Sequence, residues 1–129
     1  MNDTTASPAP SNLAVVRGTI HGEAQVRELP GGSTVVQFDV TTPIRSDGRG
    51  ATVSVPIAWN DPSAAELGLL VPGCGVLVVG TVRRRFFRVG GATQSRTEVV
   101  ADVVAPTRHR KRVAVALRQA ADRILDVGT

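Results

Sequence analysis

Two long runs rich in β-branched residues, joined by Gly90-Gly91, constrain the fold of this chain more than any other feature. The segment from Val76 to Val104 reads VLVVGTVRRRFFRVGGATQSRTEVVADVV. β-Branched side chains fit a pleated, half-buried surface, and glycine supplies the positive φ angles that a tight antiparallel connection requires. The segment therefore predicts a β-hairpin.

Side chains on a strand alternate between two faces, so the first strand of this hairpin presents two different surfaces. The two sets are Val82, Arg84 and Phe86, and Arg83, Arg85 and Phe87. Guanidinium groups match phosphates, and a flat ring can stack on a base, which is the combination that a single-stranded nucleic-acid surface needs. We expect Phe86 to lie in the core and Phe87 to be exposed.

Three further apolar stretches, at 13–29, 33–44 and 51–59, precede the hairpin and read as strands. Gly18 inside the first stretch predicts a bend or bulge. In the second, Val36, Phe38 and Val40 share one face.

The spacing of the apolar residues changes between residues 60 and 70, and this segment predicts a short helix. Asn60 or Asp61 is expected to cap it, with Pro62 at its first position.

This order of elements contains no βαβ repeat, so the sheet should be mainly antiparallel. It predicts an all-β fold: an OB-fold, which is a five-stranded Greek-key barrel whose open face binds oligonucleotides or oligosaccharides, with the short helix between strands 3 and 4. We expect a flexible arm at 1–11, the barrel at 12–106 and a basic amphipathic helix at 107–129.

The C-terminal helix carries an apolar stripe, formed by Val113, Leu117, Ala120 and Ile124. Packing on its own barrel and packing on a partner subunit are both open at this point. Membrane attachment is less favoured, because the solvent-facing side of the helix carries both acidic and basic residues.

Composition limits the classes of function that we expect for this chain. Lys and Arg number 15 against 11 Asp and Glu, and Lys111 is the sole lysine. A genome rich in Arg codons explains the number of arginines equally well. Cys74 is the only cysteine, so we expect no disulfide within the chain, and nothing resembles a signal peptide or membrane span. The acids and the two histidines form no catalytic or metal-ligating motif, so we expect a cytoplasmic protein without enzymatic activity, metal or cofactor.

The order and spacing of these residues resemble those of bacterial single-stranded DNA-binding (SSB) proteins over roughly residues 12 to 105. The matching positions are Gly18, Val26-Arg27, Phe38-Asp39-Val40, Pro56-Ile57-Ala58-Trp59, Leu70, Pro72-Gly73, Val79-Gly80, Val82-Arg83 and Thr97 to Asp102. The resemblance implies binding of single-stranded DNA without sequence preference, in replication, repair or recombination. It also implies a homotetramer, or at least a dimer, associated with the nucleoid.

Candidate binding residues follow from the resemblance and from the hairpin. Trp59 and Phe87 match base-stacking positions, although Trp59 ends an apolar run and burial is its alternative. The expected phosphate-contacting residues are Arg83 and Arg85 on the hairpin strand, Arg45 and Arg49 in the loop expected at 45–50, and Arg88 and Arg96 beside the hairpin turn. For each of the last four, an ordinary solvated charge is the alternative.

Two departures suggest a short paralogue. Val53 stands where the family has an aromatic residue, and the sequence ends LDVGT directly after the helix. Docking of replication enzymes through an acidic tail is therefore not expected. Two alternatives stay open: a primosome-like accessory protein that binds single-stranded DNA or RNA within an assembly, and a protein-interaction module that uses the C-terminal helix.

Overall fold

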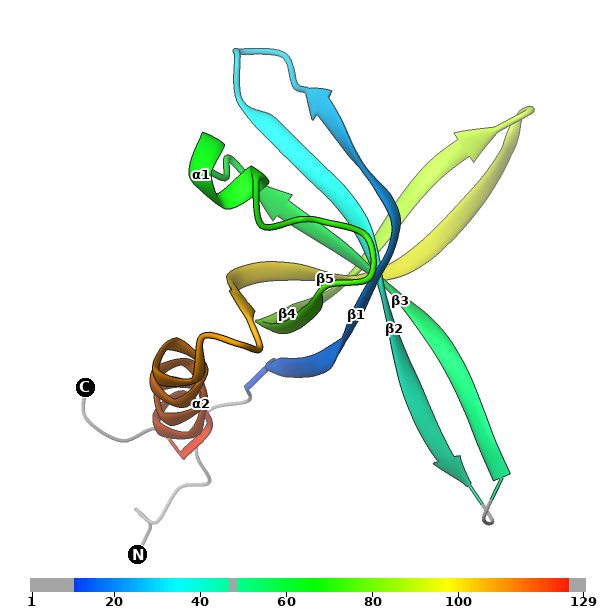
Figure 1. The fold of residues 1–129 in the computed structure, drawn as a ribbon. Helices are drawn as coiled ribbons and strands as arrows, with labels where there is room; N and C mark the ends of the chain where they lie inside the picture. Colours follow the sequence, from blue (N-terminus) through cyan, green and yellow to red (C-terminus); the bar gives the residue numbers. More distant parts are fainter. Residues whose placement is uncertain (1–10, 47–48, 126–129) are drawn as a thin grey trace, which may run out of the picture.

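The computed structural model describes residues 11–46 and 49–125. In chain order the elements are β1 (Ala14–Glu28), β2 (Thr34–Ser46), β3 (Arg49–Asn60), α1 (Ala64–Leu67), β4 (Gly75–Val89), β5 (Ala92–Pro106) and α2 (Arg110–Leu125). This is the predicted order (Figure 1). The β2–β3 connection is shorter than the loop expected at 45–50, because the two strands stay paired as far as Ser46 and Arg49. The expected arm lies, apart from Ser11, outside the described residues.

The five strands form a closed barrel in the order β1-β2-β3-β5-β4. Neighbouring strands pair antiparallel except β3 and β5, which pair in parallel through Ile57–Val99, Ala58–Val100 and Trp59–Ala101. Strand β1 pairs with both β2 and β4 and so completes the ring. The barrel confirms the OB-fold.

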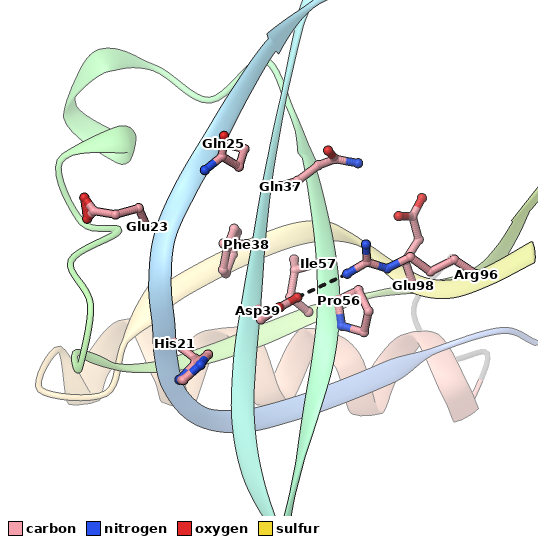
Figure 2. A pocket seen from close by; sticks show the side chains of 10 residues that line it. All are labelled: His21, Glu23, Gln25, Gln37, Phe38, Asp39, Pro56, Ile57, Arg96 and Glu98. Atoms are coloured by element: carbon pink, nitrogen blue, oxygen red, sulfur yellow. Dashed lines mark hydrogen bonds and ion pairs between the residues drawn. The ribbon is translucent and has the colours of Figure 1, made fainter. Parts of the chain in front are cut away.

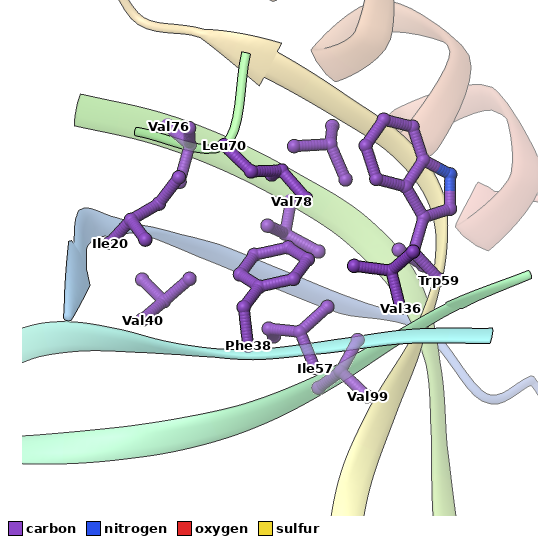
Figure 3. Packing of buried hydrophobic residues seen from close by; sticks show 12 residues of the cluster. Ile20, Val36, Phe38, Val40, Ile57, Trp59, Leu70, Val76, Val78 and Val99 are labelled. Atoms are coloured by element: carbon purple, nitrogen blue, oxygen red, sulfur yellow. The ribbon is translucent and has the colours of Figure 1, made fainter. Parts of the chain in front are cut away.

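Strand alternation builds the core (Figure 3). Val36 and Val40 are fully buried, and Phe38 between them is 4% exposed, which confirms the predicted inner face of β2. Ile57 and Trp59 of β3 pack in the same cluster, together with Val76 and Val78 of β4. Alternate residues of neighbouring strands therefore fill one interior.

Glycine allows the strands to cross closely at two points. A Cβ atom at Gly18 would overlap the carbonyl oxygen of Thr41, and one at Gly80 would overlap that of Val100. The register of β1 shifts between His21 and Gln25, rather than at Gly18 as expected. Gly18 thus serves close strand contact, not the bulge.

Helix α1 begins at Ala64, two residues later than predicted. Ser63 is its N-cap, and Ser63 and Glu66 form a reciprocal capping box in which Ser63 Oγ accepts from the Glu66 amide. Asp61 instead accepts a hydrogen bond from the Thr34 amide at 2.8 Å, which ties the end of β3 to the start of β2.

Helix α2 packs on its own barrel through small residues. Ala116 and Ala120 are 4% exposed and contact Leu77 and Val79 on the outer face of β4. The predicted stripe was wrong in part, because Leu117 is 43% and Ile124 47% exposed. Arg123 Nη1 lies 3.1 Å from Asp102 Oδ2 and fastens the helix to β5. Neither helix in the described ranges has the length and apolarity needed to cross a membrane.

Candidate nucleic-acid interface

The β4–β5 hairpin extends beyond the barrel and turns at Gly90-Gly91, as predicted (Figure 1). Both glycines have positive φ, at 57° and 84°, which suits a two-residue turn. The turn fixes the register, so Arg83 pairs with Glu98 and Arg85 with Arg96. Because paired residues share a face, the outer face of this hairpin carries three arginines and one glutamate.

Glu98 is the centre of this face and is 2% exposed. Arg83 donates to its Oε2 atom through both Nε, at 3.2 Å, and Nη2. The Nε atom of Arg85 lies 3.5 Å from the same oxygen. Two guanidinium groups therefore share one carboxylate. We call Arg83, Arg85 and Glu98 the arginine cluster, and it carries one net positive charge.

Phe87 extends this face towards the hairpin tip. The guanidinium of Arg85 lies 5.3 Å from the centre of the Phe87 ring, which is a cation–π distance, and Phe87 is half-buried. Phe86 is 66% exposed, so the expectation that Phe86 lies in the core was wrong. At residue 86 the strand has left the barrel, and neither of its faces meets the core.

A hollow lies beside the arginine cluster (Figure 2). It is lined by His21, Glu23, Gln25, Gln37, Phe38, Asp39, Pro56, Ile57, Arg96 and Glu98. Arg96 Nη2 lies 3.4 Å from Asp39 Oδ1 and joins β5 to β2 across it. Because Glu98 belongs to both features, the hollow and the arginine cluster are continuous. We call the hollow together with Arg83, Arg85 and Phe87 the outer groove.

Trp59 is absent from the outer groove. Its side chain is 5% exposed and packs beside Val36, its pairing partner on β2 (Figure 3). Alternation along β3 places it on the same face as Ile57, which points into the barrel. Base stacking needs an exposed ring, so the assignment of Trp59 as a stacking residue is corrected to a core residue.

Another predicted arginine, Arg88, lies at the hairpin turn and not in this cluster. Arg88 Nη2 donates to the Gly91 carbonyl at 2.9 Å and so braces the hairpin turn. The backbone of Arg45 and Arg49 ends β2 and begins β3, but their side chains lie outside the described part of the structure.

Sequence reasoning missed Glu98, Asp39 and the two glutamines as parts of the site. A signal for Glu98 was present, because it lies as far after Gly91 as Arg83 lies before Gly90. A two-residue turn pairs residues that are equally distant from it. No such local signal places Asp39 opposite Arg96, because that contact depends on how the barrel closes.

No protein-family model matches this sequence, and no curated protein matches it significantly. Solved structures do match. The structure described as Plasmodium falciparum SSB in complex with ssDNA superposes with a TM-score of 0.66 at 18% sequence identity, covering 78% of this chain and 98% of that chain. At this identity the likeness establishes a shared fold.

Proposed function

We propose that this protein binds single-stranded DNA without sequence preference along the outer groove, and that it catalyses no reaction. The observation that carries the proposal is the convergence of Arg83, Arg85 and Phe87 on one face of the hairpin, beside an open hollow. Arginine matches phosphate geometry, and an aromatic ring stacks on any base. The Plasmodium falciparum protein with this fold is in a complex with ssDNA, which supports the same class of partner.

The ion pairs of the outer groove determine which contacts a bound phosphate would have to replace. Arg83 and Arg85 face Glu98, and Arg96 faces Asp39. An incoming phosphate therefore competes with a carboxylate already in place. Contacts made to phosphate rather than to base edges carry no sequence information, which supports binding of any sequence. We place this activity in the cytoplasm, on single strands of the nucleoid exposed during replication, repair or recombination.

Fluorescence anisotropy with labelled single-stranded DNA, duplex DNA and RNA of equal length tests the proposal. We expect the single-stranded DNA to bind most tightly and its affinity to fall steeply with salt, because each neutralised phosphate releases counterions. Equal binding of RNA would favour the primosome-like alternative. An absence of binding at low salt would sink the proposal.

A matched pair of variants localises the contact. Arg83→Ala removes a cation of the outer groove, whereas Arg84→Ala removes the neighbouring cation from the opposite face of the same strand. The first should reduce the slope of log K against log salt by about 0.7, the value for one phosphate of a single strand, and the second should leave it unchanged. Equal effects would show that the face assignment is wrong.

Exposed apolar residues on α2 favour a second candidate, in which this helix joins subunits. Val115 is 46%, Ile124 47% and Leu125 67% exposed. A homotetramer is favoured within this proposal, and a dimer is possible. Light scattering of the full chain tests it, with Ile124→Ser as the disrupting variant and Ala121→Ser as its control. A monomeric wild-type protein would exclude the assembly.

A further inference from the structure

Cations gather around the start of α2, on the side of the barrel away from the tip of the β4–β5 hairpin (Figure 1). Arg108 precedes the helix, Arg110, Lys111 and Arg112 form its first turn, and Arg17 lies nearby on β1. Within residues 11–46 and 49–125 none of these five forms an ion pair. In the outer groove, by contrast, Arg83, Arg85 and Arg96 all face a carboxylate.

Three of these cations line one groove, of about 600 Å³, between α2, β1 and β4. They are Arg17, Arg108 and Arg110, and no acid lies among the residues that line it. Arg108 Nη1 also lies 3.6 Å from Cys74 Sγ, which holds the guanidinium against the barrel. We call this feature the α2 basic groove. Its charge suits an anionic ligand with several negative groups.

The first turn of α2 breaks an ordinary rule of helix design. It carries three cations and no acid, although the start of a helix is the positive end of its dipole. Cations at this end destabilise the helix, so these three residues are unfavourable for its stability. Residues that break a local rule without compensation within the fold often serve binding.

We propose that the α2 basic groove is a second contact surface for the phosphates of the same single strand. A strand bound along the outer groove would continue over β1 to α2. His21 of the outer groove and Arg17 of the α2 basic groove lie on the same face of β1, four residues apart, which corresponds to about 13 Å. This inference rests on the proposed binding of single-stranded DNA.

Guanidinium groups bind phosphate in a planar, two-point geometry, so a nucleic-acid backbone fits these three arginines well. The short path along β1 to the outer groove also favours a continuing strand over an acidic polypeptide. The two ligands remain distinguishable by experiment.

The test compares two lengths of labelled oligonucleotide, of roughly 8 and roughly 30 nucleotides, since OB-folds occupy about 4–16 nucleotides. The test variant combines Arg17→Gln with Arg110→Gln. Loss of a cation from the first turn should strengthen the helix, so weaker binding would not reflect unfolding. Arg118→Gln removes an exposed cation from the middle of α2 and serves as the control.

We expect the double variant to bind the long oligonucleotide roughly 10-fold more weakly at low salt, with a salt slope lower by about 1.4, or two phosphates. The short oligonucleotide should bind as it does to wild type, and Arg118→Gln should change neither affinity. Unchanged binding of the long oligonucleotide would overturn the inference. A similar loss of affinity for both lengths, or for the control variant, would also overturn it. Either result would mean that the overall charge of the protein attracts DNA, and not this groove in particular.

Two further outcomes separate this inference from the proposed function. If the wild-type protein binds neither oligonucleotide, both are overturned. If the wild-type protein binds both oligonucleotides and the double variant binds them equally well, only the inference of a second surface is overturned. A labelled acidic peptide containing leucine serves as the competing probe. Its binding to wild type and not to the double variant, with DNA binding unchanged, would assign the groove to a protein partner and overturn the inference.

Discussion

Arg83 and Glu98 face each other across the β4–β5 hairpin, and the carboxylate of Glu98 accepts hydrogen bonds from both Nε and Nη2 of Arg83. Glu98 is buried, whereas the side chain of Arg83 is 47% exposed. The acid is therefore fixed and the arginine can leave it. In the proposed mode of binding, Glu98 would hold the cation in place until a phosphate replaces the carboxylate.

Glu98→Gln should strengthen binding of single-stranded DNA at low salt. The amide keeps the shape of the carboxylate but removes the charge that competes with phosphate for Arg83 and Arg85. We expect the salt slope to steepen by about 0.7 and the free energy of unfolding to fall by about 1–2 kcal/mol. Anisotropy titrations and urea unfolding measure these quantities. The exposed Glu28→Gln is the control, and a shallower slope for Glu98→Gln would mean that the acid assists binding instead.

Trp59 should report on the core and not on DNA. Because its ring is buried, its emission should be blue-shifted and should not be quenched by added oligo(dT). Trp59→Ala should lower the free energy of unfolding by about 3–5 kcal/mol, as is usual for truncating a large buried ring. Fluorescence titration and urea unfolding check both statements, and strong quenching on addition of DNA would contradict the core position.

Much of the fold was predictable because alternation and turn chemistry act locally. The Gly90-Gly91 turn and the run of Val36, Phe38 and Val40 each fix one element with information from a few neighbouring residues. Alternation divides a strand into two faces, but it does not say where the strand leaves the barrel. Phe86 was misplaced for that reason, because its face continues the core face of β4 into solvent.

Other parts of the site depend on contacts between distant segments. The pairing of Asp39 with Arg96 exists because the barrel brings β2 and β5 to the same hollow. Helix α2 approaches β4 through Ala116 and Ala120, and alanines give a weaker sequence signal than Leu117 or Ile124. The predicted stripe therefore included the exposed Leu117 and Ile124 and left out Ala116, although it placed Ala120 correctly.

Gly18→Ala should destabilise the barrel strongly. Its Cβ would overlap the Thr41 carbonyl, a backbone atom that cannot move without disturbing the β1–β2 pairing. We expect the free energy of unfolding to fall by about 2–3 kcal/mol, in the range of other overpacking substitutions. Gly50→Ala is the control, because a Cβ atom added at Gly50 would meet no other atom within 4 Å. Thermal unfolding of both variants provides the comparison.

Ala120→Leu should loosen α2 from the barrel. Ala120 lies against Leu77 and Val79, so a larger side chain forces the helix away, at a cost of about 1–3 kcal/mol. Ala121→Leu places the same side chain on the neighbouring exposed position and should change stability by no more than about 0.5 kcal/mol. Equal unfolding midpoints in urea would contradict the packing of α2.

The short parallel contact between β3 and β5 has a consequence for how the chain folds. It joins three residues of each strand across a stretch of sequence that contains α1 and β4. Such distant contacts form slowly, since the intervening chain must lose its freedom before they contribute. Val99→Ala, at this contact, should therefore slow refolding in stopped-flow experiments, whereas Val79→Ala, under α2, should mainly speed unfolding. We therefore expect the meeting of β3 and β5 to limit the rate at which the barrel closes, and so to set how long the open sheet persists.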